Sequence, residues 1–374
     1  MAIAAGNRIQ SIDILRGLAM IMMAFGHSIR FFILRNFEPT DLSVTTPLAF
    51  FLRWSTHIAA PAFVFLAGIS VYIIFTKSGD AKRMSKYLIK RGIWLILLEV
   101  SLLTFFWHTH FNVIQLQVLW AIGVSFLLLA FLIYLPWKIN LALSILILVS
   151  HNILDMVELS ALSGIWLVLY TIFLHPGNFD LTSSLKIDFF YTILPYLGMM
   201  LLGFSMGKIF GYEYKRRRRI LLFSGGFMLL VFIMLRAFNL YGDPYSWSVQ
   251  AKGPIYTIMS FVNITKYPAS LQFVLFTLGT AFILLVYLER DFGPWMQKVR
   301  ILGQVAMFFY LFHIPFIRIF AKVYHVIFES NPSYPVFFII YLVIMIALMF
   351  ISEKYADFKI ERKHDKGYWW LRYL

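Results

Sequence analysis

Long apolar segments separated by short polar loops dominate the pattern of this 374-residue chain. A helix needs about 20 apolar residues to cross the ~30 Å hydrocarbon core of a bilayer, and ten segments approach or exceed that length. The pattern predicts an all-α polytopic transmembrane bundle of about ten spans, forming a single domain over residues 1–374. The predicted spans are roughly 12–34, 57–76, 91–108, 115–135, 139–156, 189–210, 220–239, 268–288, 302–323 and 335–352.

Two shorter apolar segments do not fit a span. Leu48–Ser55, which follows a proline and precedes the second span, predicts an interfacial helix. Leu162–Leu174 is also short and ends at His-Pro-Gly, so we interpret it as re-entrant or interfacial. If it crosses the membrane instead, the topology of everything after it inverts.

Basic residues orient the bundle. Loops 77–91 and 208–219 and the segment after Ser352 are rich in Lys and Arg, and ten spans place all three on one side. The positive-inside rule makes that side the cytoplasm and places both termini there. We expect a multi-pass protein of a bacterial inner membrane or a plasma membrane. The basic residues after Ser352 are Lys354, Lys359, Arg362, Lys363, Lys366 and Arg372.

Composition supports this picture and excludes several kinds of chemistry. The chain is 60% hydrophobic and 14% charged, whereas soluble domains carry about 25% charge. The net charge of +15 would suggest nucleic acid in a soluble protein, but membrane topology explains it here, and we expect no nucleic-acid partner. The absence of cysteine excludes disulfides, thiolate catalysis and cysteine metal sites. The first apolar segment lacks a small-residue cleavage site, so we interpret it as a retained span.

Three polar residues share one stripe of the first span. The eleven-residue step from Arg16 to His27 is about three helical turns, and Asp13 lies about one turn below Arg16. Polar groups inside a bilayer are costly and usually mark a functional site. Alternatively, Asp13 and Arg16 form an i,i+3 ion pair that only orients the helix.

Two histidines lie at similar depth on consecutive antiparallel spans. His27 is about 21 Å along the helix from Asp13, in the outer half of the membrane, and His57 lies near the outer start of the second span. A neutral imidazole can take and return a proton, so we predict His27 as a general base assisted by His57. The alternative for each is a core histidine bonded to a backbone carbonyl.

Other polar residues inside predicted spans are candidates for substrate contact. Glu99 is an intramembrane carboxyl that must be paired or protonated, and Arg53, Arg236 and Arg318 are candidate partners. His313 directly precedes the kink expected at Pro315, where it either contacts substrate or bonds a freed carbonyl. His108 and His110 form an H-x-H pair, a weak metal signal with no further ligands, so we expect no metal.

Basic residues on the predicted cytoplasmic side suit a phosphorylated donor. The run Arg216, Arg217, Arg218 and Arg219, with Lys208 and Lys215, is a topology anchor or a phosphate site. On the opposite side, Lys266 before Tyr267-Pro268 is an interface anchor or a contact for a sugar or carboxylate. Asn263 and Arg53 could donate to a developing oxyanion.

Several motifs in order resemble a known family. Arg16, ten residues and His27 resemble the Arg-x10-His signature of the O-antigen-type membrane acyltransferases, with Asp13 preceding it. Nearly end to end, the chain resembles the heparan-α-glucosaminide N-acetyltransferase catalytic-domain family and its bacterial relatives. The similar segments are Ser11–Met20, Arg53–Gly68, Arg91–Glu99, Leu194–Phe204, Asn263–Leu271 and Leu311–Pro315.

The resemblance implies a bundle of about ten helices that transfers acetyl from cytoplasmic acetyl-CoA to an acceptor on the far side. The eukaryotic acceptor is a terminal glucosamine, which here implies a sugar or envelope glycan. The eukaryotic enzyme has Asn at the place of His27, an acid at that of His57, and a histidine in the loop after its first span. Loop 35–56 contains Glu38 and Asp41 instead. The acceptor and the base therefore do not carry over directly.

Two other classes of function stay open from the residues alone. Glu99, Arg318 and the histidines would suit a proton-coupled transporter of an anionic or sugar solute, although the chain shows no internal repeat of the kind such proteins contain. The second alternative is a catalytically inactive scaffold in envelope assembly. The bilayer is a partner in every case, and the sequence leaves homo-oligomerisation open.

Overall fold

The computed structural model describes residues 9–33, 38–290, 292–362, 365, 367–368 and 371. Within these residues the protein is helical with one small sheet, which confirms the all-α class. Each predicted span coincides with a helix, and the expected interfacial segment is the helix α2 (Pro47–Trp54). The two chain ends, the first span's last residue and the basic residues Lys363, Lys366 and Arg372 lie outside the described residues.

Seven helical segments in the described part of the chain are long and apolar enough to cross a membrane. They are Gln10–Phe32, Pro47–Ser78, Trp137–Met156, Ile193–Gly211, Tyr214–Ala237, Ala306–Phe328 and Tyr334–Glu361. Shorter apolar helices are Val118–Leu132, Gly164–Phe173 and Leu271–Tyr287. The helix Gly164–Phe173 is ten residues long, about 15 Å, which supports the interpretation that 162–174 does not span. The count of ten spans and the cytoplasmic termini stay predictions.

The chain divides into two compact units. Unit 1 comprises residues 1–59 and 284–374, and unit 2 comprises residues 60–283. Both contain segments predicted to span the membrane. The expectation of one acyltransferase domain stays a prediction, and each unit is described separately.

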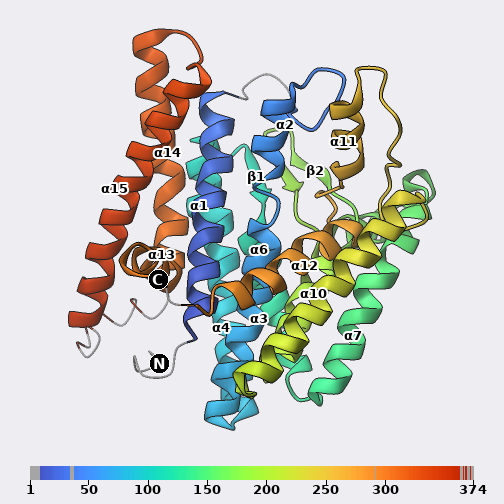
Figure 1. Cartoon of the computed structure of the whole chain (residues 1–374), viewed down its shortest axis with the longest axis vertical. Helices are drawn as coiled ribbons and strands as arrows, with labels where there is room; N and C mark the ends of the chain where they lie inside the picture. Colours follow the sequence, from blue (N-terminus) through green and yellow to red (C-terminus); the bar gives the residue numbers. More distant parts are fainter. Residues whose placement is uncertain are drawn as a thin grey trace. The chain divides into compact units, whose positions relative to one another are not determined.

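Unit 1 is built around α1 (Gln10–Phe32). Helices α13 (Pro294–Gln304), α14 (Ala306–Phe328) and α15 (Tyr334–Glu361) all pack against it, and Figure 1 shows α14 and α15 as long neighbours beside it. Glycines allow the closest approach, since a Cβ at Gly303 would collide with the carbonyl oxygen of Asp13. At the middle of α1, the Tyr341 hydroxyl donates to the carbonyl of Ile21 at 2.9 Å.

Unit 2 consists of helices that pack through small residues. α4 (Ala81–Leu98) meets α6 (Val118–Leu132) where Gly92 and Gly123 face each other, and α10 (Tyr214–Ala237) meets α12 (Leu271–Tyr287) at Gly225 and Gly279. Glycine contacts of this kind bring backbones together and are typical of membrane helices. The other helices are α3 (Ala59–Ser78), α5 (Thr104–His108), α7 (Trp137–Ser150), α8 (Gly164–Phe173), α9 (Ile193–Met206) and α11 (Pro254–Val262).

Helix α4 begins ten residues before the predicted span. Its N-cap is Asp80, whose carboxylate accepts the Arg83 amide hydrogen at 2.9 Å. The first turns carry Lys82, Arg83, Lys86 and Lys90, which is why hydropathy alone placed the start later. After Leu98 the same helix continues through a π-helical turn, Glu99–Leu103, into α5.

A three-stranded sheet lies in segments predicted to be loops or the ends of spans. β1 (Val113–Leu116) pairs in parallel with β3 (Leu185–Phe189), and β3 pairs antiparallel with β2 (Gly177–Thr182). The spatial order is β1-β3-β2. The β1–β3 pairing joins the start of α6 to the approach to α9, so the sheet connects two spans at one end of unit 2.

Candidate functional site

The two imidazoles of His27 and His313 meet inside unit 1. Nδ1 of His27 lies 2.8 Å from Nε2 of His313, although the residues are 286 positions apart. His313 is fully buried, and His27 is partly exposed. The sequence placed both residues in spans but did not predict their pairing.

The two rings lie end to end rather than face to face. Their centroids are 5.0 Å apart and their planes differ by 18°. That separation is close to the maximum that a 2.8 Å contact between ring nitrogens permits, so the line between the centroids runs nearly within both rings. Ring N–H bonds and lone pairs lie in the ring plane, and the geometry therefore suits a direct hydrogen bond.

Backbone carbonyls hold the second imidazole. Nδ1 of His313 lies 2.7 Å from the carbonyl oxygen of Tyr310 and 3.1 Å from that of Phe309. His313 therefore bonds backbone carbonyls, but neither is the carbonyl that Pro315 frees, so the predicted contact is wrong in its partner. That carbonyl belongs to Leu311, four residues before the proline.

Contacts on either side of His27 fix α1 against its neighbours. Phe25 packs against Phe337 and Tyr341 of α15, with ring centroids 5.8 and 4.9 Å away. Nε2 of His325 in α14 lies 3.2 Å from the carbonyl oxygen of Phe31. The part of α1 around His27 is therefore held by two helices.

Asp13 and Arg16 anchor the opposite end of α1. Nη1 of Arg16 donates to Asp13 at 3.0 Å and to the carbonyl of Gly303 in α13 at 3.2 Å. Asp13 is 4% exposed, and its second oxygen lies 3.5 Å from the Gln304 amide nitrogen. These contacts favour the ion-pair interpretation, in which the two residues dock and orient the helix.

His57 lies in the turn between α2 and α3. It is buried, and its neighbour Thr56 receives a hydrogen bond from Nη1 of Arg53 at 3.0 Å. A Cβ on Gly26 would lie 3.3 Å from the Thr56 side chain. The turn that carries His57 therefore packs against α1 one residue before His27.

Glu99 is bound by backbone amides rather than by an arginine. Its Oε2 accepts the amide hydrogens of Leu119 at 2.8 Å and Trp120 at 3.1 Å, in the first turn of α6. Of its predicted arginine partners, Arg236 binds Asp243 and Arg53 binds Thr56. Glu99 lies in unit 2, fully buried, where it caps α6.

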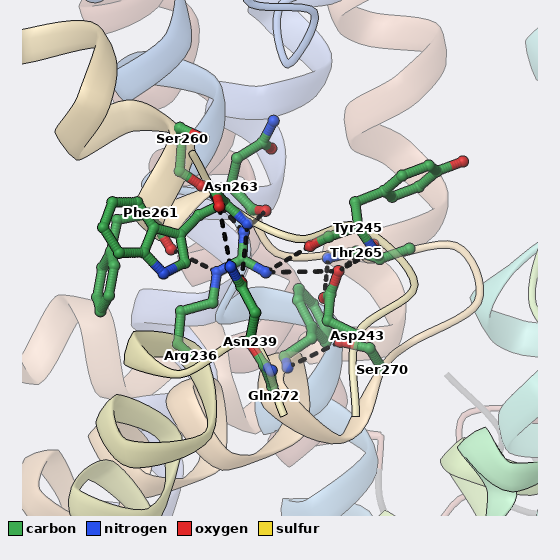
Figure 2. A network of polar contacts seen from close by, with 12 residues as sticks. Arg236, Asn239, Asp243, Tyr245, Ser260, Phe261, Asn263, Thr265, Ser270 and Gln272 are labelled. Carbon is green, nitrogen blue, oxygen red and sulfur yellow. Dashed lines mark hydrogen bonds and ion pairs between the residues drawn. The ribbon is translucent and has the colours of Figure 1, made fainter. Parts of the chain in front are cut away.

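A second polar centre of unit 2 surrounds Arg236, and we call it the arginine hub (Figure 2). The guanidinium donates at 2.7–2.9 Å to the four backbone carbonyls of Tyr245, Ser260, Phe261 and Asn263. Asp243 completes it, with a carboxylate oxygen 3.7 Å from Nη1 of Arg236. All five N–H donors of the arginine thus face an acceptor.

Asp243 extends the hub into the loop before α12. Its carboxylate accepts the amide and hydroxyl hydrogens of Thr265 at 2.8 and 2.9 Å and the hydroxyl of Ser270 at 2.8 Å. Two residues predicted to contact the acetyl acceptor lie in segments that the hub binds. The carbonyl of Asn263 accepts from Arg236, and Lys266 lies between Thr265 and Ser270, which both donate to Asp243. The Lys266 ammonium lies 5.2 Å from the Tyr267 ring centroid. Sequence reasoning did not identify Asp243 or this hub.

The predicted donor-side residues cluster at the start of α10. Lys215, Arg216, Arg218 and Arg219 are exposed, while Arg217 donates to the carbonyl of Tyr212 at 2.8 Å. Arg216 lies over the Tyr212 ring and Lys208 over the Trp137 ring, 4.2 and 4.4 Å from the centroids. Basic residues at the start of a helix oppose its dipole, so an anion would stabilise this end.

The candidate residues divide between the two units. Unit 1 holds Asp13, Arg16, His27, Asp41, Arg53, His57 and His313, and unit 2 holds Glu99, Asn263, Lys266 and the basic residues of 208–219. Asp41 is exposed, and its carboxylate accepts from the amide and hydroxyl of Ser43. Over the described residues, no group of three or more His, Asp or Glu is placed to hold a metal ion.

Comparison with known proteins gives one family. The family model described as Heparan-alpha-glucosaminide N-acetyltransferase, catalytic, matches residues 8–239, more than half of the chain. The matched range includes His27, His57 and the basic residues of α10, whereas His313 and Asn263 lie beyond it. No individual curated protein gives a significant match.

Proposed function

The chain belongs to the heparan-α-glucosaminide N-acetyltransferase catalytic family, a family of membrane acetyltransferases, and from that premise we propose that it moves acetyl from cytoplasmic acetyl-CoA to an extracytoplasmic sugar or envelope glycan. His27 is the general base of this reaction. His57 assists it, and Asp13 and Arg16 orient the helix that carries it.

The observation that supports this proposal is the His27–His313 contact. An imidazole in a membrane-spanning helix is costly unless it is bound or functional. His27 is held at one nitrogen by a second histidine, whose other nitrogen is taken up by backbone carbonyls. Such an arrangement suits a base that must change protonation state during a reaction.

The reaction requires one proton to pass through the base. The nucleophile is a hydroxyl or a neutral amine of the acceptor. It gives a proton to His27 as the oxygen or nitrogen of the acceptor bonds to the acetyl carbonyl carbon. The thioester C–S bond then breaks, and the thiolate takes the proton from the imidazolium to leave as CoA thiol. Donors are needed for the developing oxyanion, and Arg53, in the last turn of α2 shortly before His57, is our candidate.

The donor's phosphates require cations on the cytoplasmic side. We assign them to Lys208, Lys215, Arg216, Arg217, Arg218 and Arg219. Arginine binds phosphate through paired N–H bonds, and the exposed members of this cluster lie where the positive-inside rule places the cytoplasm.

The acceptor meets the opposite surface. Asp41, Asn263 and Lys266 lie in segments predicted to be extracytoplasmic, and Glu99 and His313 complete the predicted contacts from within the spans. Because His313 is fully buried beside His27, we assign it to support of the base, and we assign Glu99, which caps α6 within unit 2, to support of that helix.

The test measures release of CoA thiol by the purified full chain in lipid nanodiscs, with acetyl-CoA and glucosamine as probes. We expect His27→Gln to lower turnover by about 10²–10⁴-fold, the usual contribution of general base catalysis, and the exposed His110→Gln variant to match the wild type. Binding is checked separately, because acetyl-CoA should raise the melting temperature of the native state. Absence of a thermal shift and of thiol release, together with glucosamine uptake into proteoliposomes, would support a transporter instead.

A further inference from the structure

We propose that His313 is a positioning residue that fixes His27 as its Nδ1–H tautomer and so makes Nε2 of His27 the nitrogen that takes the proton. The catalytic part of this inference rests on the proposed function. The tautomer assignment stands on geometry alone.

The argument starts from the carbonyls around His313. A carbonyl oxygen can only accept a hydrogen bond, so Nδ1 of His313, at 2.7 Å from Tyr310 and 3.1 Å from Phe309, carries the hydrogen. The neutral ring then has its lone pair on Nε2. Backbone geometry inside α14 therefore sets the tautomer of His313.

That tautomer determines the state of the partner. Nε2 of His313 accepts, so Nδ1 of His27, 2.8 Å away, donates. The end-to-end arrangement of the rings, with planes 18° apart, points the N–H bond at the lone pair. A neutral His27 that donates from Nδ1 has its own lone pair on Nε2.

Burial decides which ring holds an additional proton. Charging an imidazole away from water is costly, and His313 is 0% exposed, whereas His27 is partly exposed. A proton taken from the acceptor therefore stays on His27, and the hydrogen bond to His313 persists in the imidazolium. His313 thus does the orienting that a carboxylate does in a Ser-His-Asp triad, but as a neutral acceptor.

Contacts within helix α14 fix the orientation of the His313 ring. The contacts of Nδ1 with carbonyls three and four residues earlier fix the ring against its own helix, and the Phe309 ring lies nearly parallel to it at a centroid distance of 5.6 Å. Movement of His313 would therefore require these contacts to break together.

The experiment is ¹⁵N NMR of the full chain with ¹⁵N-labelled histidine, where the two ring nitrogens of a neutral histidine have well-separated shifts. Spectra of His27→Gln identify the His27 signals. We expect wild-type His27 to be protonated at Nδ1 and unprotonated at Nε2. His313→Gln should keep this state, because its side-chain carbonyl can accept from Nδ1, while His313→Phe should shift His27 toward the other tautomer.

The matched control is His325→Gln, since His325 also joins α14 to α1 through its contact with Phe31. This variant should leave the His27 signals unchanged. In the turnover assay, we expect His313→Phe to lower kcat by on the order of 10²-fold, as for a misplaced catalytic group, without changing KM for acetyl-CoA, and His313→Gln to recover part of the loss.

Wild-type His27 protonated at Nε2 overturns the inference, as does an unchanged His27 signal in a folded His313→Phe variant. If the His313→Phe variant does not fold, the wild-type and His313→Gln spectra still show which ring nitrogen of His27 carries the hydrogen. Expected spectra without acetyl transfer would disprove the proposed function and leave the tautomer assignment standing. Transfer that is normal in a folded His313→Phe variant would disprove the positioning role.

Discussion

Arg236 in unit 2 and His27 in unit 1 are both ionisable residues of long apolar helices, yet their surroundings differ. Arg236 directs all five of its N–H donors at acceptors, namely four carbonyls and Asp243. His27 donates to His313 through a contact that persists when His27 takes up a further proton. The first arrangement has one favourable state, because an arginine in a protein stays protonated.

The difference teaches how to separate structural from chemical polar groups within a membrane. A hub in which every donor faces an acceptor resists change, and it holds together segments from 243 to 270. An imidazole pair can accommodate another proton without losing its central contact. The number of charged residues inside predicted spans does not distinguish a structural group such as Arg236 from a chemical group such as His27. The hydrogen-bond acceptors around each group do distinguish them.

The largest effect should follow loss of the base. His27→Gln is expected to lower turnover by about 10²–10⁴-fold while the melting temperature stays near the wild-type value, since His27 is partly exposed. Acetyl-CoA turnover and thermal unfolding on the same preparations check this. A large loss of stability with normal turnover would show that His27 has a structural role, like Arg236, and is not the base.

Arg236→Met should give the opposite result, a loss of stability. The variant leaves the Asp243 carboxylate buried without its cation and four carbonyls without donors, which costs roughly 3–5 kcal/mol. Thermal unfolding measures it, with the exposed Arg219→Met on the same helix as the control. A variant as stable as the wild type would show that water replaces the guanidinium.

Asp243→Asn should have a smaller effect, because the amide keeps an oxygen for Thr265 or Ser270. We expect a loss of about 1.5–3 kcal/mol, the range for hydrogen bonds to charged groups. Combined with Arg236→Met it should cost less than the sum of the two single changes, since no buried charge is then left alone. Additive losses in unfolding experiments would contradict direct coupling of the pair.

The smallest change tests the edge of the hub. Thr265→Val keeps the shape of the side chain and removes the 2.9 Å hydrogen bond to Asp243. We expect a loss of about 0.5–1.5 kcal/mol, with Thr280→Val, whose hydroxyl bonds only its own helix at Phe276, as the comparison. A loss as large as that of Asp243→Asn would mean that Thr265 alone determines the loop.

The positions of the long helices follow from the sequence because hydropathy over about 20 residues reports one dominant cost, that of apolar surface in water. Shorter elements were missed. Helix α13 lies in a segment expected to be a loop, although Gly293-Pro294 and the apolar residues Val299 and Leu302 are helix signals. The strands β2 and β3 are only five or six residues long, and β1 pairs with a strand some seventy residues away.

The individual site residues were also partly predictable. His27 and His313 are each predicted as site residues because they are polar and lie inside spans. Their contact, however, depends on the packing of α1 against α14, which no local sequence pattern encodes. Arg236 was considered only as a partner for Glu99. Its real partner, Asp243, lies just seven residues away in a loop, where a carboxylate gives no signal because most loop carboxylates are solvated.

The packing of Gly303 near the start of α1 affects the position of the far end of that helix. The backbone at Asp13 rests directly on Gly303, and His27 stands fourteen residues further along the same rigid rod. A methyl group at position 303 would tilt that rod about its far supports on α14 and α15. A substitution about 21 Å from the imidazoles would then act as a fine adjustment of the gap between them, able to weaken proton handling without touching either ring.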